Sequence, residues 1–244
     1  MTTIPRQRDA FGQALLDFLD GRTPETLPLE TDDGVGNPAM EPAWFFQAFD
    51  RWVEWEQRVL RNAAAPVLDL GAGAGRTSLY LQQRGLHVTA VDSSPGAVEV
   101  CRRRGVRDAR LQDFVTELPD DREWSTVLLL CGNLGLAGSW DGTRRLLKRL
   151  HTICADNAVI LADTVDPTLI EDEQVRAYQQ RMLSEGEYVG NVRLRLRYGE
   201  MTTPFWGLTN ILIADVPQLI NETGWMLEDH HVADVDHYLC LRRV

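Results

Sequence analysis

The feature that most constrains the fold of this 244-residue chain is the segment Val-Leu-Asp-Leu-Gly-Ala-Gly-Ala-Gly at positions 67–75. Its apolar residues form a run that is typical of a buried parallel strand. The three glycines lack a Cβ, so the turn that they form lets backbone N–H groups approach a ligand closely. A helical pattern begins directly after them, at Arg76. A strand, a glycine turn and a helix N-terminus predict an α/β fold with a nucleotide-sized binding site.

Asp69 narrows the choice among nucleotide-binding folds. The glycine spacing overlaps the dinucleotide fingerprint G-x-G-x-x-G, but Arg76 stands where that pattern requires Gly or Ala. A carboxylate inside an apolar strand is costly unless it is paired or hydrogen-bonded, so Asp69 either caps the glycine turn or faces a cationic ligand. The full pattern D-x-G-x-G-x-G resembles motif I of the class I S-adenosylmethionine (SAM) methyltransferases.

This resemblance assigns the first cofactor residues. It implies that Asp69 serves the cationic amino-acid end of SAM, often through water. It also implies that the turn and the first helical residue line the cofactor site, namely Gly71, Ala72, Gly73, Gly75 and Arg76.

A second acid follows the next predicted strand. Residues 85–92 are typical of a turn and a buried strand that ends at Asp92, which follows Gly75 by 17 residues. An acid that binds ribose hydroxyls is expected after about 20 residues. A carboxylate accepts two hydrogen bonds at once, which suits a vicinal diol. The resemblance implies that Asp92 and the adjacent Ser93 bind the SAM ribose.

A third acid, Asp113, follows a short predicted strand over residues 109–114. By itself it would be interpreted as an acid of a surface loop. The resemblance places it on the adenine amino group, with Phe114 supplying the adjacent backbone N–H or a stacking ring.

The most apolar run, residues 126–131, predicts a central fourth strand. In open α/β sheets ligands bind outside the carboxyl ends of strands, at the switch point of the strand order. We therefore assign Cys131 and Gly132 to the cofactor site and Asn133 to the methyl group and its acceptor. Turn chemistry explains Asn133 equally well, because Asn tolerates left-handed backbone.

The remaining pattern completes a Rossmann-like sheet. Helices are predicted over 141–155 and 215–223, and strands over 158–162, from Trp225 and over 238–241. The resemblance implies a seven-stranded, mostly parallel sheet with helices on both faces. It also implies that strand seven is antiparallel and lies between strands five and six.

Composition limits the classes of function. The net charge of −11 argues against nucleic acid as a partner. No apolar run approaches the roughly 20 residues of a membrane span, and no signal-peptide pattern is present, so a cytoplasmic protein without membrane contacts is expected. The four cysteines lie far apart and predict buried, reduced thiols. The oligomeric state is left open.

Residues 1–60 predict an N-terminal helical extension to the methyltransferase domain at 61–244. A helix is expected over 11–19, a surface loop over 22–42, and one aromatic-rich helix over 44–55. This aromatic face either packs on the sheet domain or acts as a lid that excludes water, with Trp44 and Phe45 touching substrate.

Residues 167–214 predict an α+β insertion after strand five that caps the acceptor. A polar helix is expected over 171–185 and an alternating strand over 191–198. The strand's three arginines are either solvated and paired with acids, or bind an anion, for which Arg197 is the candidate. Phe205 and Trp206 are assigned to the wall of the acceptor pocket.

Histidines and acids gather near the C-terminus, but their spacing matches no metal-ligand signature, so no metal is predicted. His237 opens strand seven, which the resemblance places beside strand five and its terminal Asp163. We predict that Asp163 orients His237 as a general base. The alternative is an ordinary surface histidine.

The sequence therefore predicts SAM-dependent methyl transfer to a small molecule, in which an O, N or C nucleophile displaces the methyl group in line. The protein's main task in such a reaction is to align and desolvate the reactants. A non-catalytic SAM-binding protein or partner subunit is the first alternative. An NAD(P)-dependent oxidoreductase is disfavoured by Asp69, Arg76 and the terminal hairpin.

Overall fold

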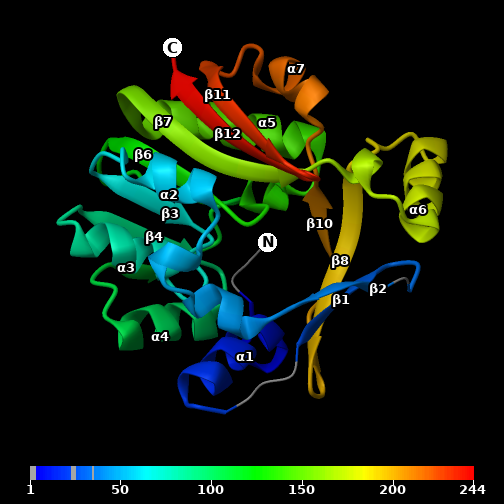
Figure 1. The fold of residues 1–244 in the computed structure, drawn as a ribbon, viewed down its shortest axis with the longest axis horizontal. Helices are drawn as coiled ribbons and strands as arrows, with labels where there is room; N and C mark the ends of the chain where they lie inside the picture. Colours follow the sequence, from blue (N-terminus) through cyan, green and yellow to red (C-terminus); the bar gives the residue numbers. More distant parts are fainter. Residues whose placement is uncertain (1–3, 23–25, 35) are drawn as a thin grey trace.

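The computed structural model describes residues 4–22, 26–34 and 36–244. Across these residues the strands form two sheets (Figure 1). The larger sheet has seven strands in the order β11-β12-β7-β6-β3-β4-β5. Their bounds are β3 Val67–Leu70, β4 Val88–Asp92, β5 Ala109–Leu111, β6 Trp124–Leu129, β7 Cys154–Val165, β11 Trp225–Ala233 and β12 Asp236–Arg243. Strand β12 is antiparallel to both of its neighbours, β7 and β11, whereas β3 to β7 are parallel, which confirms the predicted Rossmann-like sheet.

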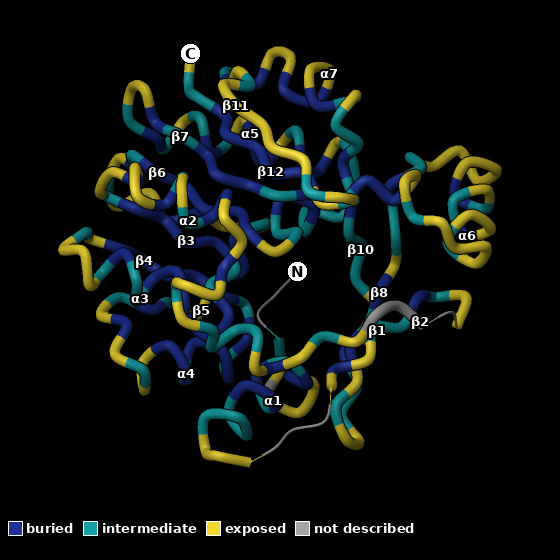
Figure 2. The backbone as a smooth tube through the Cα atoms, in the orientation of Figure 1, coloured by how far each residue is buried: buried dark blue, intermediate teal, exposed yellow. Residues whose placement is uncertain are grey.

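Helices cover both faces of this sheet, because alternate side chains of each strand point to opposite faces. Side chains of α5 (Trp140–Ile153) and α7 (Val216–Ile220) pack with Leu68 and Leu70 of β3 on one face. Those of α2 (Glu54–Leu60) and α3 (Arg76–Gln83) pack with Val67 on the other face, where α4 (Pro95–Arg104) also lies. The central strands β3, β4 and β6 are buried along most of their length, whereas the edge strand β11 is largely exposed (Figure 2).

The smaller sheet, here called the cap sheet, joins the N-terminal extension to the insertion. It has the order β10-β8-β1-β2, and β9 pairs with β8. The strands are β1 Leu27–Thr31, β2 Gly36–Met40, β8 Asn191–Tyr198, β9 Met201–Thr202 and β10 Trp206–Thr209, and α6 (Glu173–Ser184) precedes β8. Strand β1 pairs directly with β8, with Leu29 opposite Leu196.

The predicted surface loop over 22–42 is therefore wrong at residues 27–31 and 36–40, which form a hairpin, while residues 23–25 and 35 lie outside the described part. The hairpin forms because its apolar side chains are buried against β8 and helix α1 (Ala10–Leu19), where Leu27 and Leu196 share one core. In the insertion, Trp206 begins strand β10, directly after Phe205.

The single aromatic helix predicted over 44–55 is also wrong. Two short 3-10 helices, η2 (Pro42–Phe46) and η3 (Phe49–Arg51), come first, and α2 begins only at Glu54. The backbone at Trp52 is extended, and the indole N–H of Trp52 donates to the carbonyl of Gln47 at 3.0 Å. This contact folds the segment back on itself where the sequence suggests a continuous helix.

Helix α1 connects the two sheets, because it packs on the cap sheet and on α4. Gly12 and Gly96 let α1 and α4 touch, since a Cβ built on Gly96 would lie 2.6 Å from Cα of Gly12. Asp9 reinforces the contact by accepting hydrogen bonds from the N–H groups of Gly12 and Gly96 at 2.9 and 2.8 Å. None of the helices in the described ranges has the length and apolar character needed to cross a membrane.

Candidate active site

The glycine turn between β3 and α3 has the left-handed backbone that its sequence predicts. Gly71, Gly73 and Gly75 have φ of +79°, +56° and +74°. Asn133 holds this turn, because its Nδ2 donates to the carbonyls of Leu70 at 2.9 Å and Gly71 at 3.1 Å. In this conformation the amide of Asn133 serves the turn, as in the alternative interpretation.

Asp69 and Asp92 lie at the ends of β3 and β4, beside the turn. Asp69 is buried and accepts a hydrogen bond from the hydroxyl of Ser78 at 2.6 Å. Asp92 is buried and accepts from the backbone N–H groups of Gly73 at 2.9 Å and Ser94 at 2.8 Å. Burial raises the pKa of each carboxyl to about 6. Because a carboxylate has about four acceptor sites, Asp92 retains acceptor capacity for a diol.

The third predicted cofactor position lies just after β5. Asp113 is buried and accepts from the N–H of Val115 at 3.0 Å. The ring of Phe114 is buried in the main core that also contains Leu68 and Leu134, which favours the backbone N–H over the ring as its predicted contact with adenine. Ser93 accepts a hydrogen bond at its carbonyl from the N–H of Ile4 at 3.0 Å.

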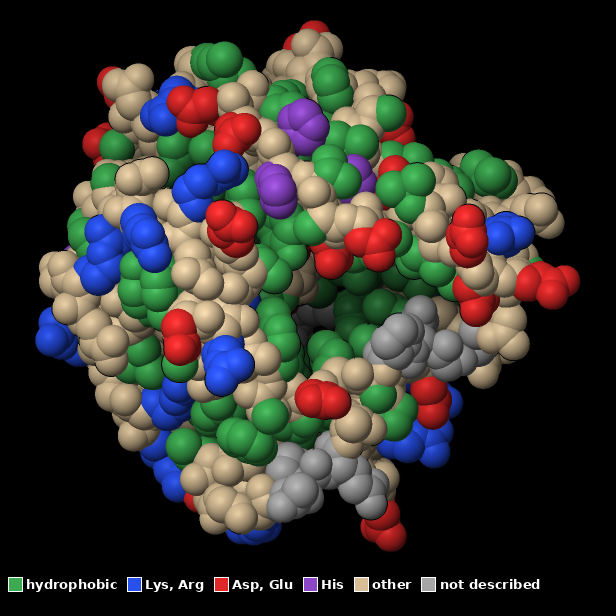
Figure 3. All heavy atoms as spheres, viewed as in Figure 1, with side chains coloured by type: hydrophobic (Ala, Val, Ile, Leu, Met, Phe, Trp, Pro, Cys, Tyr) green, Lys and Arg blue, Asp and Glu red, His purple; other side chains and the backbone are tan. Residues whose placement is uncertain are grey.

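A cavity of about 370 Å³ lies between the carboxyl edge of the large sheet and the cap sheet. Figure 3 shows its opening as a hollow with hydrophobic side chains on the wall and acidic side chains near the rim. Three of the predicted cofactor residues line it, Arg76, Cys131 and Gly132, and so does Asp163. The cavity therefore begins beside the glycine turn and extends along the ends of β6 and β7.

Arg76 forms a buried ion pair that no sequence pattern predicted. Its Nη2 lies 2.8 Å from Oε1 of Glu56, and both side chains are buried. The guanidinium lies over two indole rings, 3.9 Å from the ring centre of Trp44 and 4.7 Å from that of Trp52. Burial raises the pKa of Glu56, and Arg76 opposes this shift. The sequence signal for this pair was Glu56 itself, an acid beside an aromatic-rich segment, because a buried carboxylate needs a partner.

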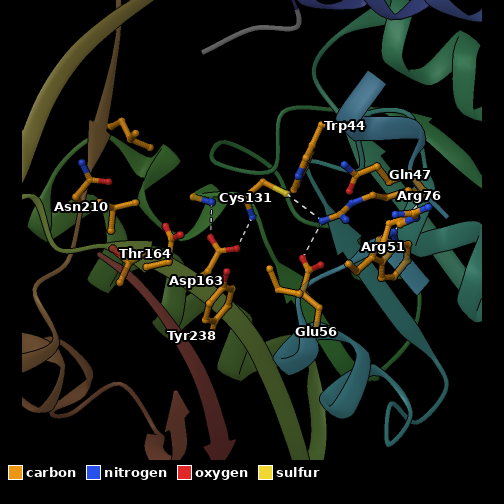
Figure 4. Close-up of a pocket in the computed structure, with 16 residues that line it drawn as sticks. Trp44, Gln47, Arg51, Glu56, Arg76, Cys131, Asp163, Thr164, Asn210 and Tyr238 are labelled. Atoms are coloured by element: carbon orange, nitrogen blue, oxygen red, sulfur yellow. Dashed lines mark hydrogen bonds and ion pairs between the residues drawn. The ribbon is translucent and has the colours of Figure 1, made fainter. Parts of the chain in front are cut away.

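Asp163 faces the cavity from the end of β7 (Figure 4). Its two oxygens accept the backbone N–H of Cys131, at 2.7 Å, and that of Gly132. Cys131 has a left-handed φ of +64°, an uncommon conformation for a non-glycine residue, and its N–H and that of Gly132 both point at the carboxylate. The side chain is partly exposed into the cavity, yet loss of surrounding water raises its pKa to about 7.

The predicted contact between Asp163 and His237 is not formed. His237 lies opposite Thr164 in the β7–β12 ladder, and Tyr238 lies opposite Asp163. Since neighbouring residues of a strand point to opposite faces, Tyr238 shares the face of Asp163 and lines the cavity. His237 is only 3% exposed, so it is no surface histidine, and neither ring nitrogen has a partner among the described residues.

Only some of the predicted acceptor residues line the cavity. Trp44 lines the cavity, whereas Phe45 lies over the glycine turn, 3.3 Å from the Cβ position of Gly73. Arg197 pairs with Glu30 at 2.9 Å, which is the acid-paired alternative.

The aromatic pair of the insertion does not reach the cavity wall. Phe205 lies under the guanidinium of Arg195, and Trp206 packs in the core of the cap sheet. Leu208 and Asn210, a few residues further on, line the cavity instead. In the residues that the structure covers, no cluster of three or more His, Cys, Asp or Glu side chains is arranged to hold a metal ion.

Comparison with known proteins agrees with this geometry. Residues 67–157 match the family model described as a methyltransferase domain. Residues 67–157, which carry the glycine turn and run from β3 into β7, are thus a methyltransferase domain, as the resemblance implies. A solved SAM-dependent methyltransferase from Bacteroides fragilis, in complex with S-adenosyl-L-homocysteine, superimposes with a TM-score of 0.84 at 24% identity. The match covers 100% of this chain and 98% of that one, so the extension and the insertion share its fold.

Other relatives match this chain over less of their length. A demethylmenaquinone methyltransferase from Clavibacter sepedonicus is 39% identical over 99 residues, which cover 36% of this chain and 40% of that protein. The chain thus spans about half or less of the curated relatives that it matches. A Burkholderia thailandensis 1,6-didemethyltoxoflavin-N1-methyltransferase has a TM-score of 0.53 at 17% identity, with coverages of 83% and 81%.

Proposed function

We propose that this protein transfers the methyl group of SAM to a small molecule that binds in the cavity. One observation carries the proposal: the cavity starts at Arg76, Cys131 and Gly132, next to the glycine turn, and continues to Asp163. The cofactor's reactive end and an acceptor would then share one enclosed space. A cavity of about 370 Å³ suits a small molecule.

The residues at the turn fit SAM. Three glycines leave a cradle without side chains, and Asp92 has acceptor sites left for the ribose hydroxyls. Arg51, on the same side of the cavity as Arg76 in Figure 4, supplies positive charge for the cofactor's carboxylate. When bound, SAM supplies an electrophilic methyl group on its sulfonium sulfur. The chain's own contribution is to align the acceptor and exclude water.

In this proposal, residues 42–53 act as a lid over the cofactor site. Phe45 covers Gly73 and packs edge-on against Phe11, with ring centres 5.0 Å apart. Trp44 and Trp52 hold Arg76 from the same segment. Binding of the cofactor at the turn would displace Phe45 and close Trp44 over the reacting groups.

Calorimetry with S-adenosyl-L-homocysteine and with NAD tests the cofactor. We expect S-adenosyl-L-homocysteine to bind and NAD not to bind. Asp92→Ala should lose about 1.5–3 kcal/mol of binding free energy, because it removes hydrogen bonds to a charged group. Asp229→Ala, which removes an exposed carboxylate on β11, is the matched control and should bind as the wild type does. Tight NAD binding, or full affinity in Asp92→Ala, would contradict the proposal; transfer of label from SAM to an acceptor tests the activity itself.

A further inference from the structure

We propose that the acceptor is a small amine, and that Asp163 receives its N–H. This inference rests on the proposed methyl transfer and specifies its substrate class. It starts from the carboxylate at the end of β7, which faces the cavity but pairs with no cationic side chain among the described residues.

The hydrogen bonds of Asp163 leave room for a ligand. Two backbone N–H groups, those of Cys131 and Gly132, occupy one acceptor site on each oxygen. A carboxylate offers about four such sites. The remaining sites belong to a side chain that is partly exposed into the cavity, so a donor on a bound molecule can reach them.

The charges around Asp163 favour a cation over an anion. Glu56 of α2 and Asp236 of β12 both act on Asp163 as like charges, and Thr164 and Tyr238 beside it are uncharged at neutral pH. Arg76 of α3 is the nearby buried cation, but Glu56 and the two indole rings already occupy its guanidinium. A carboxylate or phenolate acceptor would meet uncompensated negative charge here, whereas an ammonium group would neutralise it.

The two ends of the cavity therefore differ in charge. Arg51 and Arg76 lie towards the glycine turn, and Asp163, Thr164 and Asn210 lie towards the cap sheet (Figure 4). Positive charge suits the cofactor's carboxylate, which leaves the acidic end for the acceptor. Val165 and Leu208 give this end an apolar wall for the hydrocarbon part of an amine.

Asp163 also accepts the proton that the amine loses before it is methylated. An ammonium nitrogen has no free electron pair, so it must lose a proton before it accepts a methyl group. The N–H bond breaks, its electron pair stays on nitrogen, and the proton passes to an Oδ of Asp163, which becomes a neutral carboxyl. The pKa of Asp163, raised to about 7, suits a group that takes up this proton near neutral pH.

Three probes of one size test the proposal: benzylamine, benzyl alcohol and benzoate. Their affinities are measured by calorimetry on the full chain saturated with S-adenosyl-L-homocysteine. Benzylamine should bind at least about tenfold more tightly than benzoate, as expected for a charge-assisted hydrogen bond. Asp163→Asn should remove most of this preference for benzylamine. Asp229→Asn, an equal charge change on the exposed surface, should keep the preference.

A pH series on the unmodified protein keeps the test independent of whether Asp163→Asn folds. Benzylamine stays protonated between pH 6 and 8, whereas Asp163 loses its charge as the pH falls through about 7. Its affinity should fall by about tenfold from pH 8 to pH 6, while that of benzyl alcohol stays constant.

Three results would overturn the amine assignment: equal binding of the three probes, preference for benzoate, or an unchanged preference for benzylamine in Asp163→Asn. The last would place the amine on a group other than Asp163. These results are distinct from a failure of the proposed function, in which S-adenosyl-L-homocysteine itself does not bind.

Discussion

Asn133 shows how one side chain sets the geometry of the site. Its two hydrogen bonds to the carbonyls of Leu70 and Gly71 tie the loop after β6 to the turn after β3. A Cβ on Gly71 would lie 2.3 Å from Nδ2 of Asn133, so the amide fits only against a glycine. The cofactor turn and the cavity wall at Cys131 and Gly132 are thus held by the same residue.

Asn133→Ala should therefore lower the free energy of unfolding by about 1–3 kcal/mol, because two backbone carbonyls lose their donor. Urea denaturation measures the change. Asn62→Ala, at an exposed position before β3, is the control and should stay within about 0.5 kcal/mol of the wild type. Wild-type stability combined with lost methyl transfer would instead assign Asn133 to the acceptor.

Between elements, the contact of α1 with α4 decides how the extension is attached. Gly96→Ala should separate the helices, since the new Cβ would lie 2.6 Å from Cα and carbonyl carbon of Gly12. Overpacking of this kind costs about 1–3 kcal/mol, despite the better helix propensity of alanine. The N-terminal segment should then be cleaved faster by a protease, with Glu99→Ala on the same helix as the control. An unchanged cleavage rate would show that the helices have room to part.

At the scale of the whole molecule, the extension and the insertion form one structural unit, because their strands share the cap sheet. A chain that starts at residue 61 would lack α1, β1 and β2, and would expose Leu194 and Leu196 of β8. We expect it to unfold at a lower temperature than the full chain and to bind a hydrophobic dye. Thermal melting and dye fluorescence measure both effects. A cooperative transition at the full chain's temperature would mean that residues 61–244 are an independent domain.

Features that depend on residues close together in the sequence could be predicted, whereas contacts between residues far apart in the sequence could not. The glycine turn and the apolar strands depend on neighbours within a few residues, and these were predicted. The pair Glu56–Arg76 joins residues 20 apart, and the contact between Arg195 and Glu30 joins residues 165 apart. No local pattern specifies such partners.

The sequence by itself determined the α/β class and the acids at the ends of β3, β4 and β5, because strand periodicity and glycine conformation are local properties. The place of β12 between β7 and β11 followed from the resemblance to the methyltransferases. Only the tertiary structure decided which residues line the cavity. A shift of one residue along β12 places Tyr238 rather than His237 beside Asp163, since side chains alternate between faces. Likewise, residues 27–31 form strand β1 because they pair with the edge of β8 and bury apolar side chains against it.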